Sequence, residues 1–270
     1  MYKRIDKNNK VLKSEEFQKD KYKFFLILQN LSSDTLELYS DEENYVLCRG
    51  DWKWPTWIWT KDNLDKTLVK EVEEAIELYR LNTDTRYTAK RELYNLLKED
   101  NYESLGDYYF KMGFLECEQT VPPRKTDGYI DKVKEEDKDI LVKFIYDESR
   151  EITDTRNLSL EEAEETFAKR LSTGNYYVWK NDNDEIVAQA FYRVEDECAK
   201  VAGVMTRSDQ RCKGYAANLI YHLTNKALSQ GYHVSLYTDY SYIPSNKAYK
   251  NVGYQDKDVL INFSCKKKVL

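Results

Sequence analysis

The sequence has few of the residues that build metal sites and disulfide frameworks. Among its 270 residues are 2 histidines and 5 cysteines, and no two cysteines stand in a CxxC pair. A zinc site is therefore not expected. An odd number of thiols without a framework pattern is typical of a reduced, cytoplasmic protein.

Long apolar runs and an excess of positive charge are also missing. No stretch approaches the ~20 apolar residues that a membrane span needs, and the polar N-terminal segment lacks the apolar core of a signal peptide. The net charge of −6 argues against a general nucleic-acid binder, which needs a basic face, and mildly favours a cationic partner. Apolar residues make up 41% of the chain, which is enough for a core without staples.

Glycine and proline are scarce, so the places where they occur are informative. The chain has 9 glycines and 4 prolines, and two of the prolines fall within residues 119–128, a segment with few apolar residues. Such a segment is typical of a linker. We therefore predict a boundary near residue 123, with one domain in residues 1–122 and another in residues 123–270.

The two predicted domains differ in how regular their patterns are. In the first, residues 45–59 are typical of strands with a break at Pro55, and apolar spacing predicts helices around residues 68–79 and 93–97. In the second domain, the pattern predicts two helices, three antiparallel strands, a helix, a strand, a short helix and a last strand. Ser159 and Glu162 form a capping box in front of its second helix. This order indicates a mixed α/β fold.

The segment RCKGYA, residues 211–216, separates the predicted strand 199–206 from a predicted amphipathic helix. The first amides of a helix have no internal partner and lie at the positive end of its dipole, so anions bind there. Gly214 would let a phosphate approach the backbone, and Arg211 and Lys213 add positive charge. The segment therefore predicts a pyrophosphate site, although many glycine turns of this kind bind nothing.

At these residues the sequence resembles the GCN5-related N-acetyltransferases. That family carries R/Q-x-x-G-x-G/A before a helix, and Arg211, Gly214 and Ala216 match this motif in order. Downstream, YIPSNKAYKNVGY (242–254) resembles the family segment N-P-x-S-N-x-x-Y-x-x-x-G-F/Y. The resemblance covers the C-terminal half. It implies a mostly antiparallel sheet of the acyl-CoA N-acyltransferase type, with acetyl-CoA as co-substrate and no metal.

The resemblance also implies roles for single residues. The loop would hold the coenzyme pyrophosphate through its amides, the preceding strand would line the pantetheine arm, and Asn246 would contact the coenzyme from the last helix. Tyr249 would act as the catalytic acid that protonates the departing thiolate. The implied coenzyme-binding residues are Val204, Met205, Thr206, Arg211, Cys212, Lys213, Gly214, Tyr215, Ala216 and Asn246.

The chemistry of acetyl transfer asks for a neutral amine, a donor for the oxyanion and a proton for the thiolate. The backbone N–H of Met205 is a candidate oxyanion donor. No glutamate lies inside the strand VAGVMT, so the general base is not evident. Glu195, Asp196, Glu197 and Asp239 are nearby candidates, and water or no base at all are alternatives.

Two classes of function fit these observations. The leading one is an N-acetyltransferase that moves an acetyl group from acetyl-CoA to a primary amine of a small molecule or peptide. A variant uses a longer acyl-CoA. The alternative is a catalytically inactive acyl-CoA-binding protein, which the missing strand glutamate favours and Tyr249 disfavours. The sequence names neither the acceptor nor the oligomeric state.

The N-terminal half offers two further hypotheses. YFKMGF (109–114) resembles YKNVGY (249–254), and each segment is interpreted as a short helix ending at glycine. This predicts that residues 1–122 are a degenerate acetyltransferase-like domain that does not bind coenzyme but completes the acceptor cleft. The segment WKWPTWIW (52–59) predicts either a cage for a cationic amine or, as we favour, tryptophans alternating on strands and buried on one face.

Overall fold

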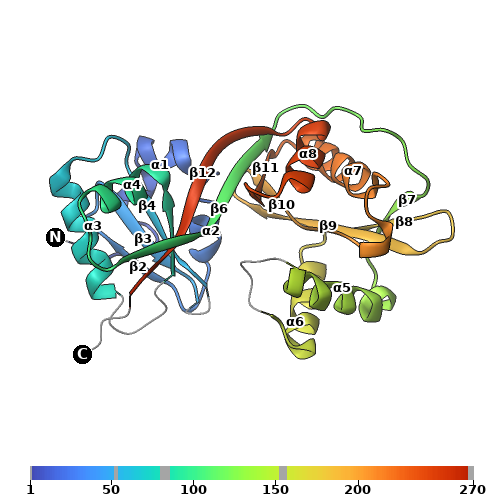
Figure 1. The fold of residues 1–270 in the computed structure, drawn as a ribbon, viewed down its shortest axis with the longest axis horizontal. Coiled ribbons are helices and arrows are strands. Elements are labelled where there is room, and N and C mark those ends of the chain that lie inside the picture. Colours follow the sequence, from blue (N-terminus) through green and yellow to red (C-terminus); the bar gives the residue numbers. More distant parts are fainter. Residues whose placement is uncertain (1, 52–53, 80–85, 152–156, 267–270) are drawn as a thin grey trace. The chain divides into compact units, whose positions relative to one another are not determined.

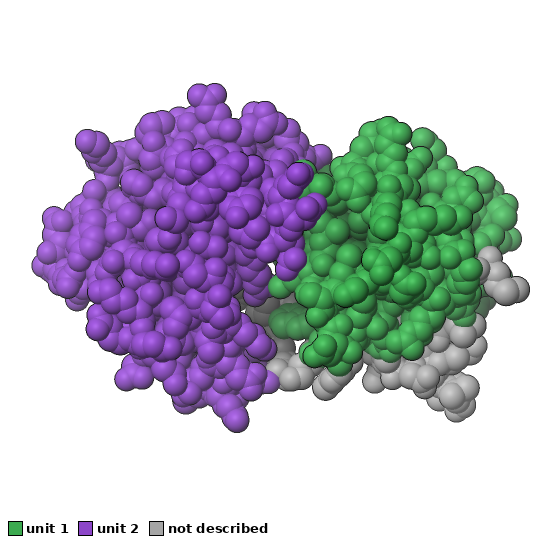
Figure 2. Space-filling model, turned by 180° about the vertical axis from the view of Figure 1, so that it is seen from behind, with its two compact units in different colours: residues 1–113, 258–270 green, residues 114–257 purple. Residues whose placement is uncertain are grey.

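The computed structural model describes residues 2–51, 54–79, 86–151 and 157–266. It divides into two compact units (Figure 2). Unit 1 comprises residues 1–113 and 258–270, and unit 2 comprises residues 114–257. Each unit has its own hydrophobic cores and is described by itself. No helix in these residues is long and apolar enough to cross a membrane.

Unit 1 is a sheet with helices on both faces. Its strands follow the order β1-β2-β3-β4-β5-β12, with parallel pairing between β4 and β5 and antiparallel pairing elsewhere. Its elements are β1 (Lys3–Arg4), η1 (Lys10–Lys13), α1 (Glu15–Asp20), α2 (Phe25–Asn30), β2 (Glu37–Ser40), β3 (Tyr45–Arg49), β4 (Thr56–Thr60), α3 (Lys66–Tyr79), β5 (Arg86–Lys90) and α4 (Arg91–Glu99).

Unit 2 contains the predicted acetyltransferase region. Its strands follow the order β11-β10-β9-β8-β7, with parallel pairing only between β10 and β11. Its elements are β7 (Tyr129–Lys132), η3 (Glu135–Asp137), α5 (Lys138–Glu151), α6 (Leu160–Leu171), β8 (Tyr176–Lys180), β9 (Ile186–Glu195), β10 (Cys198–Thr206), η4 (Ser208–Gln210), α7 (Tyr215–Ser229), β11 (His233–Asp239) and α8 (Ile243–Val252). The mixed, mostly antiparallel fold predicted from the sequence is confirmed.

Two strands have residues in both units. β6 (Leu105–Cys117) starts among the residues of unit 1 and ends in unit 2, and β12 (Gln255–Cys265) starts in unit 2 and ends in unit 1. Phe263 of β12 is fully buried in the core of unit 1, where its ring stacks on Tyr87 at 5.6 Å between centroids. The sequence predicted a short helix at residues 109–114. That prediction was wrong, because these residues lie inside β6.

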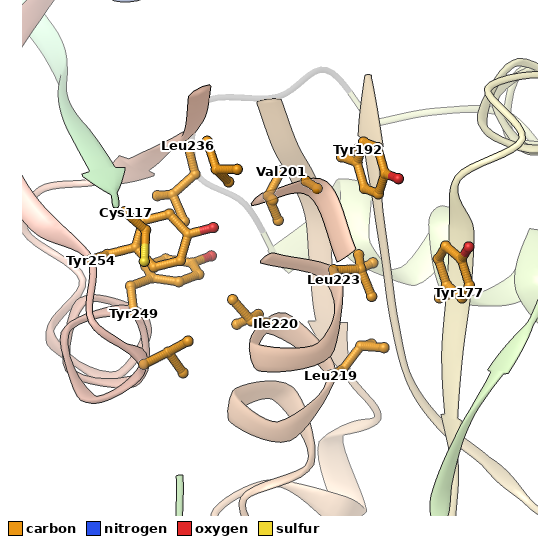
Figure 3. Packing of buried hydrophobic residues seen from close by; sticks show 14 of the residues in the cluster. Cys117, Tyr177, Tyr192, Val201, Leu219, Ile220, Leu223, Leu236, Tyr249 and Tyr254 are labelled. Carbon is orange, nitrogen blue, oxygen red and sulfur yellow. The ribbon is translucent and has the colours of Figure 1, made fainter. Parts of the chain in front are cut away.

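The helices of unit 2 cover both faces of its sheet (Figure 1). α7 and α8 pack on one face, through one core that includes Leu219, Leu223 and Val252 (Figure 3). α5 and α6 pack on the other face, through a second core that includes Leu141 and Phe167. Neighbouring side chains of β8 alternate between these cores, as the two-residue period of a strand requires. Of the apolar positions at helical spacing in α7, Leu219, Ile220, Leu223 and Ala227 are fully buried.

The order of elements in unit 2 repeats that of unit 1 (Figure 1). Each repeat has one strand, two helices, three strands, a helix, a strand, a helix and a final strand, apart from short 3₁₀ turns. The pairing directions also repeat: the three central strands are antiparallel, and the third is parallel to the strand after the long helix. The two units thus share one order of elements and one set of pairing directions, and the duplication stays a prediction.

The tryptophan-rich segment divides into a buried part and an exposed part. Trp57 and Trp59 lie on β4 and are buried on one face of the sheet, as the favoured hypothesis predicted. Trp54 is exposed and lies outside a strand, and Trp52 lies outside the described residues. Trp59 donates its indole N–H to Asp20 at 3.0 Å, and the ammonium of Lys90 lies 5.8 Å from the Trp59 ring centroid. Within unit 1, the cation over this ring is therefore a lysine of the chain itself.

One lysine is buried within unit 2. Lys200 on β10 is 4% exposed, and its ammonium lies 4.6 Å from the Phe114 ring centroid and 3.9 Å from that of Tyr237. Burial lowers the pKa of Lys200 to about 7 from its ordinary value of 10.5, and the charges of Cys198 and Glu116 only partly oppose this. The folded protein therefore loses the lysine proton at a lower pH than the unfolded chain does.

The buried lysine predicts a stability difference that depends on pH. Below pH 7 the folded protein bears the full cost of the buried charge. Between pH 7 and 10.5 the unfolded chain binds the proton and the folded protein does not, so stability rises with pH. We expect Lys200→Met to raise the free energy of unfolding more at pH 6 than at pH 9. Urea denaturation at both values measures this, and an equal gain at both would contradict it.

Candidate functional site

The central feature of unit 2 is the point where two parallel strands stop pairing. β10 and β11 are in register from Cys198–His233 to Val201–Leu236, and in the described structure their pairing ends there. β10 nevertheless continues to Thr206, paired with β9 alone, and the register shifts by a bulge between Ala202 and Met205. A bulge bends its strand and increases the local twist. The edge of β10 that faces β11 is therefore open beyond Val201.

The bulge depends on a glycine. Gly203 has φ +59°, and a Cβ there would lie 2.6 Å from the ring of Phe191. Only glycine accepts both this backbone conformation and this close approach at low cost. The three predicted strand residues that follow it are Val204, Met205 and Thr206, and all three are half-buried on the unpaired part of β10. Their backbone is thus placed where an extended ligand could pair with it.

The loop after β10 ends at a helix start without a side-chain cap. Gly214 is the N-cap of α7, with φ +93°, and no side chain caps the first amides of that helix. A Cβ at Gly214 would be in ordinary van der Waals contact with its neighbours, the nearest being the side chain of Asn218 at 3.7 Å. Cys212 in the same loop is exposed and has φ +63°. The uncapped amides are the groups at which an anion would bind at a helix start.

The basic side chains of the loop have partners of their own. Arg211 forms an ion pair with Glu151 of α5 and donates to the carbonyl of Thr206 at 3.2 Å. Lys213 donates to Gln210 at 2.7 Å. The ion pair of Arg211 and the hydrogen bond of Lys213 are both exposed to solvent. The loop therefore keeps part of its positive charge. The arginine ties the end of β10 to α5, while the lysine keeps a positive charge beside the helix start.

Tyr215 and Ala216 offer backbone rather than side chains. Tyr215 is buried, and its hydroxyl donates to the carboxylate of Asp127 at 2.9 and 3.0 Å. Ala216 is half-buried in the first turn of α7. Only their N–H groups are placed to contact an anion at the helix start.

Asn246 organises the loop between β11 and α8. Its amide nitrogen donates to the carbonyls of Asp239 and Tyr240, at 2.9 and 3.1 Å. Its Oδ1 is buried and accepts no hydrogen bond from the described residues. A buried acceptor without a donor is uncommon in folded proteins. An amide N–H of a bound ligand would satisfy it, which fits the coenzyme contact predicted for this residue.

Tyr249 lies inside the protein beside a second tyrosine (Figure 3). It is 8% exposed on α8, and its ring is 6.1 Å from that of Tyr254 in an edge-to-face arrangement. Burial raises the pKa of Tyr249, and the charge of Glu148 raises it further. The phenol is therefore protonated at neutral pH, as a general acid must be before it acts.

The four acidic residues considered as bases lie in less favourable places. Glu195, Asp196 and Glu197 surround the turn before β10, at the paired end of the strand and away from the bulge. Asp239 accepts hydrogen bonds from the backbone and hydroxyl of Ser241, as a turn residue does. Sequence reasoning missed a different carboxylate, Glu148 of α5, whose charge reaches Tyr249. In the sequence, Glu148 is marked only by being a glutamate at a position where the helical spacing of α5 predicts an apolar residue.

Unit 1 lacks this arrangement at the corresponding helix. The loop between β4 and α3 contains no glycine, and the carboxylate of Asp65 accepts the N–H of Leu68 at 2.8 Å. An acidic cap occupies the amides that an anion would need and repels it. The structure therefore offers no counterpart of the Gly214 site among the described residues of this loop.

Comparison with known proteins supports the fold. Residues 141–254 match the model of the Acetyltransferase (GNAT) family. The C-terminal half carries the signature of this family. The matched range includes the bulge, the loop, α7 and α8, and a search of the curated proteins finds no significant match to the chain.

Solved GNAT structures resemble the model over more than the matched segment. An acetyltransferase of this family from Colwellia psychrerythraea aligns with TM-score 0.61 and 12% identity, over 98% of this chain and 100% of its own. A GCN5-related N-acetyltransferase from Sphaerobacter thermophilus aligns with TM-score 0.60 and 12% identity, over 86% and 84%. One from Kribbella flavida gives 0.57 and 16%, over 82% and 86%. At these identities the likeness concerns the fold alone.

The left-handed conformation of Cys212 generates a stability prediction. A side chain at positive φ costs about 1 kcal/mol, and glycine avoids that cost. We expect Cys212→Gly to raise the free energy of unfolding by up to about 1 kcal/mol, measured by urea denaturation. Cys212→Ala keeps the Cβ and serves as the control. A gain in the alanine variant equal to that in the glycine variant would show that backbone strain is not the cause.

Proposed function

We propose that the protein is an N-acetyltransferase that moves an acetyl group from acetyl-CoA to a primary amine by direct attack. The observation that carries this proposal is the conjunction, in one unit, of an unpaired strand edge and an uncapped helix start. The first is the β10 edge beyond Val201, and the second is the α7 start at Gly214. The GNAT match over 141–254 supports the same reaction class.

The described residues fit the coenzyme in three places. The amides of the Arg211–Ala216 loop and helix start would hold the pyrophosphate, with Lys213 adding charge. The backbone of Val204, Met205 and Thr206 would pair with the pantetheine amides. The orphaned Oδ1 of Asn246 would accept one pantetheine N–H. The group of His, Cys, Asp and Glu side chains that a metal needs is absent from the described residues, and the proposed reaction uses none.

The chemistry then follows from the residues around the strand opening. The N–H of Arg207 donates across to Val187 of β9 at 2.9 Å, so Met205, two residues earlier in the same register, also turns its N–H toward β9. The N–H of Thr206, which faces the open edge, would instead donate to the oxyanion that forms when the amine attacks the thioester carbonyl. The C–N bond forms, the C–S bond breaks with its electron pair on sulfur, and the phenol of Tyr249 protonates the thiolate. We place this reaction in the cytoplasm, where acetyl-CoA is accessible and the chain's thiols stay reduced.

The alternative is a protein that binds acyl-CoA without turnover, or one that transfers a longer acyl group. Release of free coenzyme thiol, measured with acetyl-CoA and longer acyl-CoAs over a panel of small and peptide amines, separates these functions. Amine-dependent release with acetyl-CoA supports the proposal. Coenzyme binding without release by any amine would indicate the binding protein, and release confined to longer acyl chains would indicate the variant.

Gly214→Glu tests the location of the pyrophosphate. The carboxylate would lie beside the helix amides and repel the coenzyme by bulk and charge. We expect at least a hundredfold loss of acetyl-CoA affinity by calorimetry, with an unchanged circular dichroism spectrum. Gly231→Glu is the control, because Gly231 follows the other end of α7 and, with φ +86°, introduces a side chain at a similar positive φ. Equal affinities in the two variants would place the pyrophosphate elsewhere.

Tyr249→Phe tests the general acid. The substitution keeps the ring in its packing and removes the hydroxyl, and general acid catalysis contributes about 10²–10⁴-fold. We expect kcat to fall by about 10²-fold or more with little change in coenzyme affinity. Tyr254→Phe is the control, because the Tyr254 hydroxyl pairs with Thr224 at 2.8 Å in the core and its loss affects stability rather than rate. A Tyr249→Phe rate within threefold of wild type would remove Tyr249 from the mechanism.

A further inference from the structure

A buried ion pair joins the two helices that cover one face of unit 2. Glu148 of α5 accepts hydrogen bonds from both terminal nitrogens of Arg170 of α6, each at 3.0 Å. The amide of Gln189 on β9 donates to the same carboxylate at 3.3 Å, and Gln189 in turn accepts from the hydroxyl of Tyr176. The side chains of Glu148 and Arg170 are each 10% exposed. The carboxylate is thus held in a fixed position inside the protein.

This cluster lies directly under the bulge of β10. Gln189 is the cross-strand partner of Met205, the neighbour of Thr206, whose N–H is proposed to serve the oxyanion. A Cβ at Gly203 would lie 3.1 Å from the guanidinium carbon of Arg170. The bulge, the ion pair and the oxyanion donor therefore occupy one small region of the sheet.

Glu148 and Tyr249 approach that region from opposite faces. α5 packs in the core on one face, and Tyr249 of α8 belongs to the core on the other. The charge of Glu148 nevertheless reaches the phenol and adds to the rise of its pKa. A paired sheet would separate two such groups. Beyond Val201 no β10–β11 pair lies between them, so the opening places an acid on one side and a carboxylate on the other.

The hydrogen bonds leave one carboxylate oxygen for another use. All three bonds that Glu148 accepts from described residues go to Oε2, and none goes to Oε1. A buried ion pair is expensive to desolvate and is often replaceable by apolar residues without loss of stability. Its presence beneath the bulge therefore suggests a role besides holding α5 to α6.

We propose that Glu148 is the general base for the acceptor amine, acting through Oε1, and that it works as a pair with Tyr249 across the strand opening. This assignment rests on the proposed function and deepens it. Arg170 and Gln189 then act as positioning residues that fix the carboxylate through Oε2.

The protons balance in this scheme. Glu148 takes one proton from the ammonium form of the acceptor, and the neutral amine forms the C–N bond. As the C–S bond breaks, Tyr249 gives its proton to sulfur and regains one from the nitrogen of the new amide. The proton on Glu148 then passes to water. One amide, one free coenzyme thiol and one proton result, and no oxidant or metal is needed.

The test compares Glu148→Gln with wild type over pH 6 to 10, using the best amine from the panel. The amide keeps the shape and an oxygen toward Arg170 but cannot take a proton. We expect kcat at pH 7 to fall by about 10²–10⁴-fold. We also expect the variant's rate to rise with pH as the amine loses its own proton, while acetyl-CoA affinity by calorimetry stays within twofold. Asp147→Asn, next to it on α5 and exposed beside Lys143, should match wild type.

The pH profile must also allow for the groups that face Glu148. These are Arg170 from α6, Tyr176 from β8 and Tyr249 from α8. The pKa values of both tyrosines are raised by burial, and that of Arg170 is raised by the carboxylate despite its burial. All three groups thus keep their protons at neutral pH. A difference between the profiles of wild type and Glu148→Gln near neutral pH therefore does not come from these three groups and supports the assignment.

Two further outcomes complete the test. A Glu148→Gln variant that retains a rate within threefold and an unchanged pH profile overturns the base assignment and leaves the proposed function intact, with the ion pair purely structural. If Glu148→Gln does not fold, Glu148→Asp replaces it in the test, because aspartate keeps the charge but withdraws the carboxylate. A tenfold or greater loss of kcat at unchanged coenzyme affinity supports the assignment. A wild-type rate overturns it. A wild-type protein that binds acetyl-CoA but acetylates no amine refutes both proposals.

Discussion

The divergence of β10 from β11 after Val201 is the constraint on which the rest of the site depends. Backbone groups in a sheet normally satisfy one another, and β10 gives up that satisfaction along one edge from Ala202 to Thr206. The bulge at Gly203 makes this possible by bending the strand while β9 still holds it. The coenzyme contacts, the acid and the base that we propose all depend on the edge that results.

The start of α7 adds uncapped backbone N–H groups next to this strand edge. Because Gly214 leaves the first amides of α7 uncapped, positive potential lies just beyond the end of the open strand. Unit 1 has the same order of elements, but the start of its corresponding helix is capped. Its equivalent helix has the Asp65 cap, and Lys90 at the end of β5 is paired with Asp20 at 2.5 Å and Asp62 at 2.6 Å. With the same order of elements, the helix start is therefore uncapped in unit 2 and has an acidic cap in unit 1.

The sequence predicted the local features well and the long-range ones poorly. The apolar spacing of α7, the capping box at Ser159 and the strand patterns of β8, β9, β10 and β11 depend on neighbours within a few residues, and the structure confirms them. The short strand β7 was not predicted. Residues 109–114 were misassigned because their strand pairs with segments distant in the chain. Glu148 was overlooked because its hydrogen-bond donors, Arg170 and Gln189, are 22 and 41 residues away in the chain. No local sequence pattern indicates these contacts. The choice of domain boundary at residue 123 and the individual site roles stay predictions.

The position of β12 in the sheet of unit 1 has a consequence for the order in which that sheet is synthesised. Leu260, Ile261 and Phe263 of β12 complete the buried sheet of unit 1, yet they are synthesised after all of unit 2. In the order of synthesis, β5 is therefore made long before the strand that covers one of its edges. Domains usually fold in order of their emergence, but the sheet of unit 1 is complete only once residues 258–265 have emerged.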